Sequence, residues 1–241
     1  MDFANKERLI EFLRKPNIKY LAQGGQGICY LDINTNIVYK LFYSYLDDDN
    51  ISYTKEEILF FSNIENDTFI WPLDVISIKG NVIGYTSHYK RAKNLYETNP
   101  FTVNLVKLLE LMKKTKEDIK LLSEKNVAIY DMMYNTLLSS QGIYVIDTLD
   151  YGNNPVSFEK NSRAFNAEFK YFLVDGLFDD FVMSNKILKE MYSDIKVCPI
   201  EFLKEFKKSL SEYLDSEVNN LSTARKLVRR SNREPKYIRI I

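Results

Sequence analysis

The feature that most constrains the fold is a series of three apolar segments near the N-terminus, separated by two short polar turns. The segments lie at 18–21, 28–31 and 37–42, and the turns at 24–27 and 34–36 are rich in glycine or asparagine. Glycine and asparagine accept turn conformations that other residues avoid. The pattern predicts a meander of antiparallel strands. Because the glycine turn has a strand on both sides, it is neither a Walker loop nor a dinucleotide-binding loop, each of which opens a helix.

Periodicity in the rest of the chain predicts one helix inserted among five strands, followed by a mainly helical region. The expected elements are helices at 5–15, 54–64 and 102–125, strands at 74–80 and 81–89, short apolar runs at 127–129, 136–138 and 143–146, and mostly helices from 165 onward. This order lacks the regular strand–helix alternation of a doubly wound sheet. We therefore expect an α+β fold with two unequal lobes, an N-terminal β-rich lobe at 1–90 and a helical C-terminal lobe at 91–241.

The charge balance limits the classes of partner. Lys+Arg and Asp+Glu each number 33 in 241 residues, which argues against binding nucleic acid or an anionic membrane over the whole surface. A basic run at 225–239 is a weaker indication that the chain binds nucleic acid or an acidic partner. A solvated final helix explains this run as well. The charged N-terminus and the lack of a long apolar run lead us to expect a cytoplasmic protein without a membrane segment.

Cysteine and histidine usage argues against a zinc site. The two cysteines, Cys29 and Cys198, lie far apart and form no CxxC pair, and His88 is the only histidine. Structural zinc sites need four such ligands, usually in closely spaced pairs. This usage is consistent with a reducing compartment.

Lys40 stands inside an apolar strand segment, where an ammonium is costly unless a carboxylate neutralises it. The predicted helix that follows offers Glu57, which lies at the border of its apolar face. Glu56 is the close competitor, because a shift of one residue would exchange them. The alternative is an exposed lysine on an edge strand and two surface glutamates.

A second group of polar residues follows the apolar runs in the middle of the chain. Asp131 ends one run, Asn135 comes four residues later, and Asp147 ends the run that begins at 143. Two carboxylates and an amide oxygen suit Mg²⁺, which prefers oxygen ligands and keeps several waters. For each aspartate alone, a turn-forming role at a strand end is the simpler explanation. All these residues in this order favour a phosphate and metal site.

Together, these motifs resemble those of the protein-kinase-like superfamily over residues 18–152. The turn is similar to the kinase glycine loop, with Gly24 and Gly27 at its second and third glycines and Gly25 between them. Ala22 replaces the first glycine, and Cys29 replaces the valine that covers adenine. The resemblance implies a two-lobed kinase fold that binds ATP and Mg²⁺ between its lobes.

The resemblance also implies a role for each polar residue. Lys40 would pair with Glu57 and hold the α- and β-phosphates, while Asn135 and Asp147 would bind Mg²⁺. Asp131 would orient the hydroxyl that accepts the γ-phosphate. The activity implied is that of a Ser/Thr protein kinase, acting on a protein substrate.

The strand at 81–89 would lead into the hinge that borders adenine in this family. Within it, Thr86 to Tyr89 is the expected source of backbone hydrogen bonds to the base. His88 would then be a hinge side chain and not a catalyst.

Several residues depart from the kinase pattern. Asn135 is one residue closer to Asp131 than in the family, Met133 replaces the usual basic residue, and Leu149 replaces the glycine after the metal-binding aspartate. These departures keep open a pseudokinase that binds nucleotide or a regulatory protein partner without phosphoryl transfer. A small-molecule kinase of the aminoglycoside or choline type is a third alternative, although that type usually has a histidine before the first aspartate.

Overall fold

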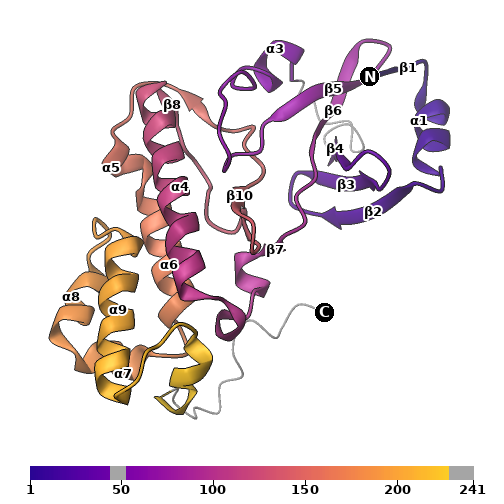
Figure 1. Ribbon diagram of the computed structural model, residues 1–241. Helices are drawn as coiled ribbons and strands as arrows, with labels where there is room; N and C mark the ends of the chain where they lie inside the picture. Colours follow the sequence, from indigo (N-terminus) through magenta and orange to yellow (C-terminus); the bar gives the residue numbers. More distant parts are fainter. Residues whose placement is uncertain (44–52, 228–241) are drawn as a thin grey trace. The chain divides into compact units, whose positions relative to one another are not determined.

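The computed structural model describes residues 1–43 and 53–227, and in it the chain divides into two compact units (Figure 1). The first unit comprises Met1–Arg91 together with Asp147–Leu149, and the second comprises Ala92–Ile146 and Asp150–Ile241. The first is built on a mixed sheet and the second mainly on helices, so the predicted α+β class is confirmed.

The first unit contains one six-stranded sheet in the order β1-β5-β6-β4-β3-β2. Its strands are β1 (Asp2–Phe3), β2 (Ile18–Gln23), β3 (Gly27–Asp32), β4 (Ile37–Phe42), β5 (Pro72–Ile78) and β6 (Asn81–His88). Neighbouring strands are antiparallel except β1 and β5, which are parallel. The five predicted strands are confirmed. Strand β1 was not predicted, because two residues are too few for an alternating pattern.

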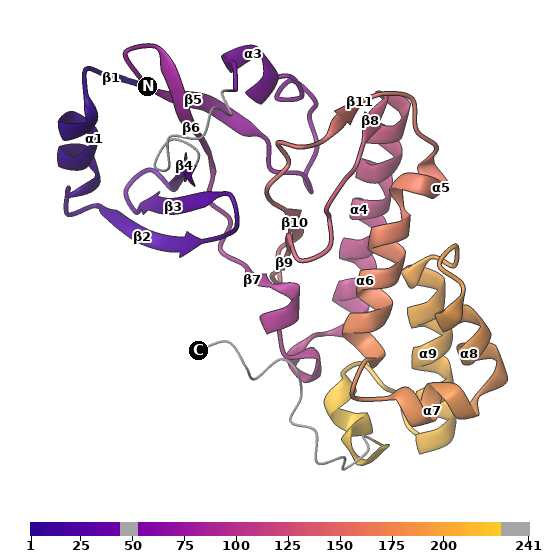
Figure 2. The ribbon, with the colours of Figure 1, turned by 180° about the vertical axis from the view of Figure 1, so that it is seen from behind.

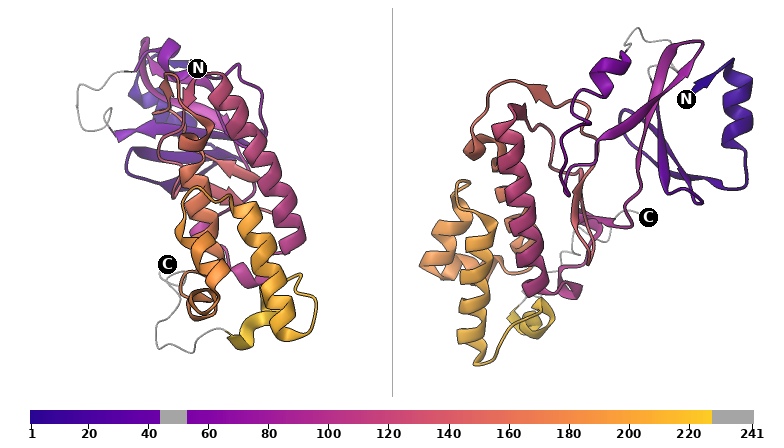
Figure 3. Two further views of the ribbon diagram at one scale, coloured as in Figure 1. Left: turned by 90° about the vertical axis from the view of Figure 1, so that its left-hand side faces the viewer. Right: turned by 45° about the horizontal axis from the view of Figure 1, so that its top comes forward.

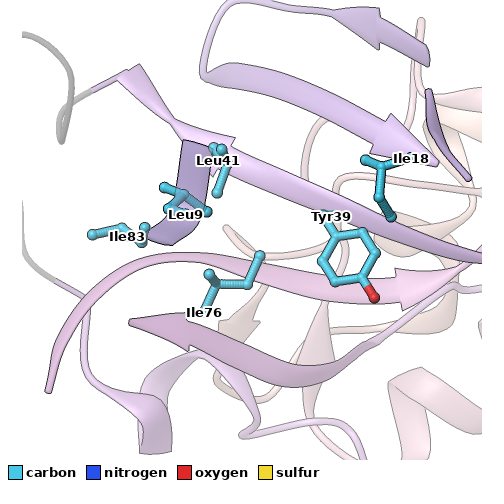
Figure 4. Packing of buried hydrophobic residues seen from close by; sticks show 6 residues of the cluster. All are labelled: Leu9, Ile18, Tyr39, Leu41, Ile76 and Ile83. Atoms are coloured by element: carbon cyan, nitrogen blue, oxygen red, sulfur yellow. The ribbon is translucent and has the colours of Figure 1, made fainter. Parts of the chain in front are cut away.

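One face of this sheet is covered by α1 (Lys6–Leu13), which confirms the first predicted helix. The helix begins where the Asn5 side chain accepts the backbone N–H of Arg8 at 3.0 Å. Figure 4 shows the cluster on this face. Its buried members are Leu9, Ile18, Tyr39, Leu41, Ile76 and Ile83. Tyr39 and Leu41 of β4 are therefore buried on this face, and the residues that alternate with them point to the other face of the sheet.

The opposite face of the sheet packs against α3 (Lys55–Ile58) through a smaller cluster. Phe42, Val75 and Tyr85 of the sheet meet Ile58 there, and Leu149 packs against the same cluster. Helix α3 is much shorter than the predicted helix 54–64, and that prediction is wrong beyond residue 58. The aromatic, serine and asparagine residues that follow have low helix propensity, and the Ser62 hydroxyl donates to the Pro72 carbonyl at 2.7 Å.

The second unit is built around three packed helices with aromatic side chains between them. Its helices are α4 (Leu105–Glu124), α5 (Phe158–Asn161), α6 (Arg163–Val174), α7 (Asp179–Ser184), α8 (Lys186–Ser193) and α9 (Pro199–Leu214), with 3₁₀ turns η1 (Leu95–Glu97), η2 (Pro100–Thr102) and η3 (Leu221–Leu227). Figures 2 and 3 show α4, α6 and α9 running alongside one another. Phe165, Phe169, Phe202 and Phe206 are buried in this core.

Short strands of the second unit frame the loop that holds Asp131 and Asn135. Strands β7 (Lys93–Asn94), β9 (Thr136–Leu138) and β10 (Ile143–Val145) form a three-stranded sheet, and β8 (Val127–Ala128) pairs with β11 (Gly152–Asn153). The apolar runs noted at 127–129, 136–138 and 143–146 thus contain strands β8, β9 and β10, and β9 pairs with β10 as a hairpin. The loop 129–135 lies between β8 and β9.

In the described residues, no helix combines the length and apolar character needed to cross a membrane. Within the basic run at 225–239, the guanidinium of Arg225 lies 4.8 Å from the ring centroid of Phe101. The rest of that run, from residue 228 onward, lies outside the described residues. The second unit therefore uses at least the first of these basic side chains for packing.

Candidate functional site

Three of the residues predicted to surround the nucleotide lie in one row across the first unit's sheet. Ala22 pairs with Cys29, Cys29 pairs with Lys40, and Lys40 pairs with Tyr85. Directly opposed residues of antiparallel strands lie on the same face. Ala22, Cys29 and Lys40 therefore share the face that α1 leaves uncovered.

The Lys40 side chain is buried, with 8% of the residue exposed, and its ammonium has two acceptors. It donates to Asp147 Oδ1, and to Gln26 Oε1 at 3.1 Å. It also lies 5.7 Å from the ring centroid of Tyr85. The lysine charge is thus neutralised by an aspartate 107 residues away in the sequence.

Asp147 is held in place by the residues that follow it. Its φ of +60° is a left-handed conformation that aspartate tolerates better than most residues. The next residue, Thr148, is buried and donates its hydroxyl to the Ile70 carbonyl at 3.2 Å. Leu149 packs into the cluster beneath the sheet. These contacts fix the carboxylate beside Lys40.

The predicted partner of Lys40, Glu57, is used elsewhere, which corrects the sequence prediction. Its carboxylate accepts the backbone N–H of Thr54 at 2.8 Å and the Thr54 hydroxyl at 3.0 Å, while the Thr54 hydroxyl accepts the Glu57 N–H. This is a capping box at the start of α3. Because these hydrogen bonds stabilise the charged form, the pKa of Glu57 is lowered. The competitor Glu56 is exposed on the same short helix.

The glycine turn contains two different kinds of glycine. The Gly24 N–H donates to the Gly27 carbonyl at 3.0 Å and closes the turn. A Cβ on Gly24 or Gly25 would meet no protein atom within 4 Å, whereas one on Gly27 would lie 2.1 Å from the Leu41 carbonyl oxygen. Gly27 is therefore required by the close approach of β4. Gly24 and Gly25 leave open space where a bulky anion can approach the backbone.

Two of the residues predicted to border adenine, Thr86 and His88, have their side chains on the sheet face opposite to that of Lys40. Thr86 pairs with Tyr39, and His88 pairs with Ile37, so both side chains lie on the face that α1 covers. The backbone at Thr86 lies between β4 and β5, and the Tyr89 N–H donates to the Asn36 carbonyl at 2.9 Å. The predicted role of Thr86, His88 and Tyr89 concerns backbone hydrogen bonds to adenine and stays a prediction from the sequence.

Cys29 lies next to Lys40 in the row, with its side chain partly buried. Burial raises the pKa of its thiol, and the negative charge of Asp147 adds to this, while the positive charge of Lys40 opposes it. The thiol is therefore kept in its neutral form, consistent with a packing surface and not with a nucleophile.

Asp131 and Asn135 lie together in the second unit. The Asn135 amide donates to the Asp131 carbonyl at 2.8 Å and to its carboxylate at 3.4 Å. Asp131 is exposed and has a φ of +49°. The Ile146 N–H donates to the Asn135 carbonyl at 3.0 Å, so the backbone of Asn135 is tied to the residue just before Asp147. The four-residue spacing thus forms a compact loop that offers a carboxylate and an amide.

Sequence reasoning missed two buried residues that support this loop. Asn161 accepts the Ile129 N–H at 2.9 Å and donates to the Val127 carbonyl at 2.9 Å. Glu168 accepts the Tyr134 N–H at 3.2 Å and the Thr136 hydroxyl at 2.6 Å. Burial raises the pKa of Glu168 to about 7, although both hydrogen bonds act in the opposite direction. One sequence feature could have indicated that Glu168 is buried, namely its place among Phe165, Phe169 and Phe172 at helical spacing.

The described residues hold no cluster of three or more His, Cys, Asp or Glu side chains suited to a metal ion. Asp147 in the first unit and Asn135 in the second each carry an oxygen of the kind that Mg²⁺ prefers. The Lys40 ammonium is a cation of the kind that pairs with phosphate oxygens.

Comparison of the chain with models of protein families and with curated proteins found no match. The resemblance to protein kinases therefore stays a prediction from the sequence motifs. Function has to be inferred from two groups of residues, Lys40 with Asp147 in the first unit and Asp131 with Asn135 in the second.

Proposed function

We propose that the chain is an ATP- and Mg²⁺-dependent phosphotransferase of the protein-kinase type, acting on a serine or threonine hydroxyl of a protein substrate. The observation that carries the proposal is the ion pair between the buried Lys40 and the half-buried Asp147. A buried ion pair contributes little net stability compared with apolar residues of similar size. Its position beside a glycine turn with open space fits a binding role better than a purely structural one.

The roles follow from the chemistry of each group. The Lys40 ammonium would hold phosphate oxygens, with the backbone at Gly24 and Gly25 approaching the same anion. Asp147 would exchange part of its contact with Lys40 for Mg²⁺, with Asn135 as the second protein oxygen. Asp131 would orient the acceptor hydroxyl. The proposal requires both pairs of residues to act on one nucleotide.

A pseudokinase is the second candidate, and one observation favours it. Glu57 caps its own helix, so Asp147 is the carboxylate that neutralises Lys40. A metal ligand that is also the lysine's counter-ion has two competing tasks, which slows phosphoryl transfer while leaving nucleotide binding possible. Met133 adds to this, because no cation stands at its position to neutralise charge in the transition state.

The test combines nucleotide binding with phosphoryl transfer. We expect Mg·ATP to raise the melting temperature of the wild-type chain, and labelled γ-phosphate to appear on the chain itself or on a generic protein substrate. Asp147→Asn and Asp131→Asn should each reduce transfer by at least about 100-fold, because each removes a charge that acts on the reacting groups. Glu57→Gln is the matched control, since its carboxylate contacts Thr54 and not Lys40.

The outcomes separate the candidates. A thermal shift without transfer would replace the phosphotransferase with the pseudokinase. No thermal shift by any nucleotide with Mg²⁺ would reject both. Loss of transfer in Glu57→Gln would show that Lys40 changes partner during turnover.

A further inference from the structure

Glu168 is the most deeply buried carboxylate that the proposed reaction does not use. It lies on α6 with 1% of the residue exposed, among the phenylalanines of the second unit's core. An acid is not retained in such a place for packing, because desolvation disfavours its charge. The role of Glu168 therefore lies in the hydrogen bonds that its two carboxylate oxygens accept.

Both oxygens of Glu168 hold residues that flank Asn135. Oε1 accepts the backbone N–H of Tyr134 at 3.2 Å, and Oε2 accepts the hydroxyl of Thr136 at 2.6 Å. Thr136 is itself fully buried, and its hydroxyl lies 3.2 Å from the Met132 carbonyl. The carboxylate thus fixes the chain on both sides of Asn135 without touching that residue.

The loop that Glu168 holds is in a strained conformation. Tyr134 has a φ of +71°, which is unfavourable for a bulky residue, and Asp131 has a φ of +49°. Additional contacts keep Tyr134 there: its carbonyl accepts the Asn94 amide at 2.6 Å, and its ring stacks on Tyr96 with centroids 4.8 Å apart. Strained backbone persists only where its surroundings over-determine it, and such places are often functional.

We propose that Glu168 is a positioning residue, which holds Asn135 in the geometry needed to ligate Mg²⁺ by fixing Tyr134 and Thr136 on either side of it. The inference rests on the proposed function. The carboxylate accepts both hydrogen bonds through its two oxygens, whereas the amide of a glutamine would have to donate to the Thr136 hydroxyl, which would then turn its own proton away from position 168 to the Met132 carbonyl.

The experiment measures the Mg²⁺ concentration that gives the half-maximal ATP-induced rise in melting temperature. For Glu168→Gln we expect this midpoint to increase about 10- to 100-fold, which is typical when a group that orients a metal ligand is lost. Thr136→Val should raise it too, and the double variant should raise it by less than the product of the two effects, because the side chains act through one hydrogen bond.

Lys170→Met is the matched control. Lys170 is on the same helix and also buried, with 2% exposed, but its ammonium donates to the carbonyls of Met191 and Asp194. We expect this variant to change the melting temperature of the ligand-free protein and to leave the Mg²⁺ midpoint unchanged. A role of Glu168 in packing alone would make the two variants behave alike.

A second readout needs no nucleotide. Amide hydrogen exchange in the ligand-free protein should speed up across 131–136 in Glu168→Gln and not in Lys170→Met. A normal wild-type response to Mg·ATP with an unchanged midpoint in Glu168→Gln would overturn this inference alone. A wild-type chain that does not respond to Mg·ATP at all would overturn the proposed function and this role together.

Discussion

The two units both bury charged side chains, but they compensate them in different ways. In the first, the Lys40 ammonium is neutralised by the Asp147 carboxylate. In the second, the buried Glu168 and Lys170 are held by backbone groups and a hydroxyl, which carry no opposite charge. Burial raises the pKa of Glu168 and lowers that of Lys170, although the negative charge of Asp194 opposes the second shift.

This difference predicts which buried charged residues can be replaced by neutral ones without a large loss of stability. A glutamine at position 168 removes a desolvation cost and rearranges the hydrogen bond with Thr136, so stability changes little while loop geometry changes. Removing Asp147 leaves an ammonium buried without its counter-ion, which is costly. Stability measurements should therefore separate the two units, and the following predictions are ordered from the largest expected effect.

Asp147→Asn should lower the free energy of unfolding by about 2–3 kcal/mol, because it leaves Lys40 uncompensated while keeping a residue that tolerates the positive φ. Adding Lys40→Met should recover most of that loss, since no buried charge then remains. Urea denaturation of the single and double variants measures both. Equal stability of Asp147→Asn and the wild-type chain would mean that the ion pair is not needed for folding.

The stability of the wild-type chain should depend on the protonation of Glu168. With a pKa of about 7 in the folded protein and 4.5 in the unfolded chain, folding binds a proton between these values. The stabilisation is complete below about pH 4.5 and is lost as the pH rises through about 7. Relative to Glu168→Gln, the wild-type chain should lose about 2 kcal/mol of unfolding free energy between pH 5 and pH 8. A pH-independent difference between them would contradict the burial of this charge.

The two kinds of glycine in the turn should respond differently to alanine. Gly27→Ala should cost about 1–2 kcal/mol of stability, because its Cβ would collide with the Leu41 carbonyl oxygen. Gly25→Ala should change stability by less than about 0.5 kcal/mol, yet weaken ATP binding roughly fivefold by filling the open space. Thermal denaturation and ATP titration give the two quantities. The reverse ranking in stability would show that the turn is packed differently.

The smallest effect concerns the cysteines. Because Cys29 lies in the row with Lys40, Mg·ATP should slow its alkylation by iodoacetamide by about threefold or more, whereas Cys198 should react at an unchanged rate. Mass spectrometry of the two tryptic peptides measures both rates in one sample. Equal protection of both cysteines would point to a general stabilisation of the protein.

Local patterns were enough to predict most strands and the long helix α4, because alternation and helical spacing record which face of each element is buried. They also predicted that Lys40 needs a counter-ion. The partner was predicted wrongly, although Thr54 three residues before Glu57 is the sequence signature of a capping box. The Glu57 carboxylate accepts hydrogen bonds from the nearby Thr54 and is therefore not the partner of Lys40.

Asp147 and Glu168 could not be assigned their contacts from the sequence alone. The pairing of Lys40 with Asp147 spans 107 positions, and no periodicity reports on such a distance. For Glu168, the helical pattern shows burial but not which groups its carboxylate meets. The sheet face of Thr86 and His88 could not be predicted either, since the register of β4 and β6 decides which face each side chain occupies.

The three residues Asp147–Leu149 belong to the first unit, while the chain on either side of them belongs to the second. The backbone therefore passes from one unit to the other at three points, and a fragment ending at Arg91 would not contain the whole of the first unit. Such a fragment would lack both the counter-ion of Lys40 and the leucine that fills the cluster around Phe42. Expressed alone, it should be aggregation-prone, and a synthetic peptide covering 147–149 and its neighbours should restore its solubility.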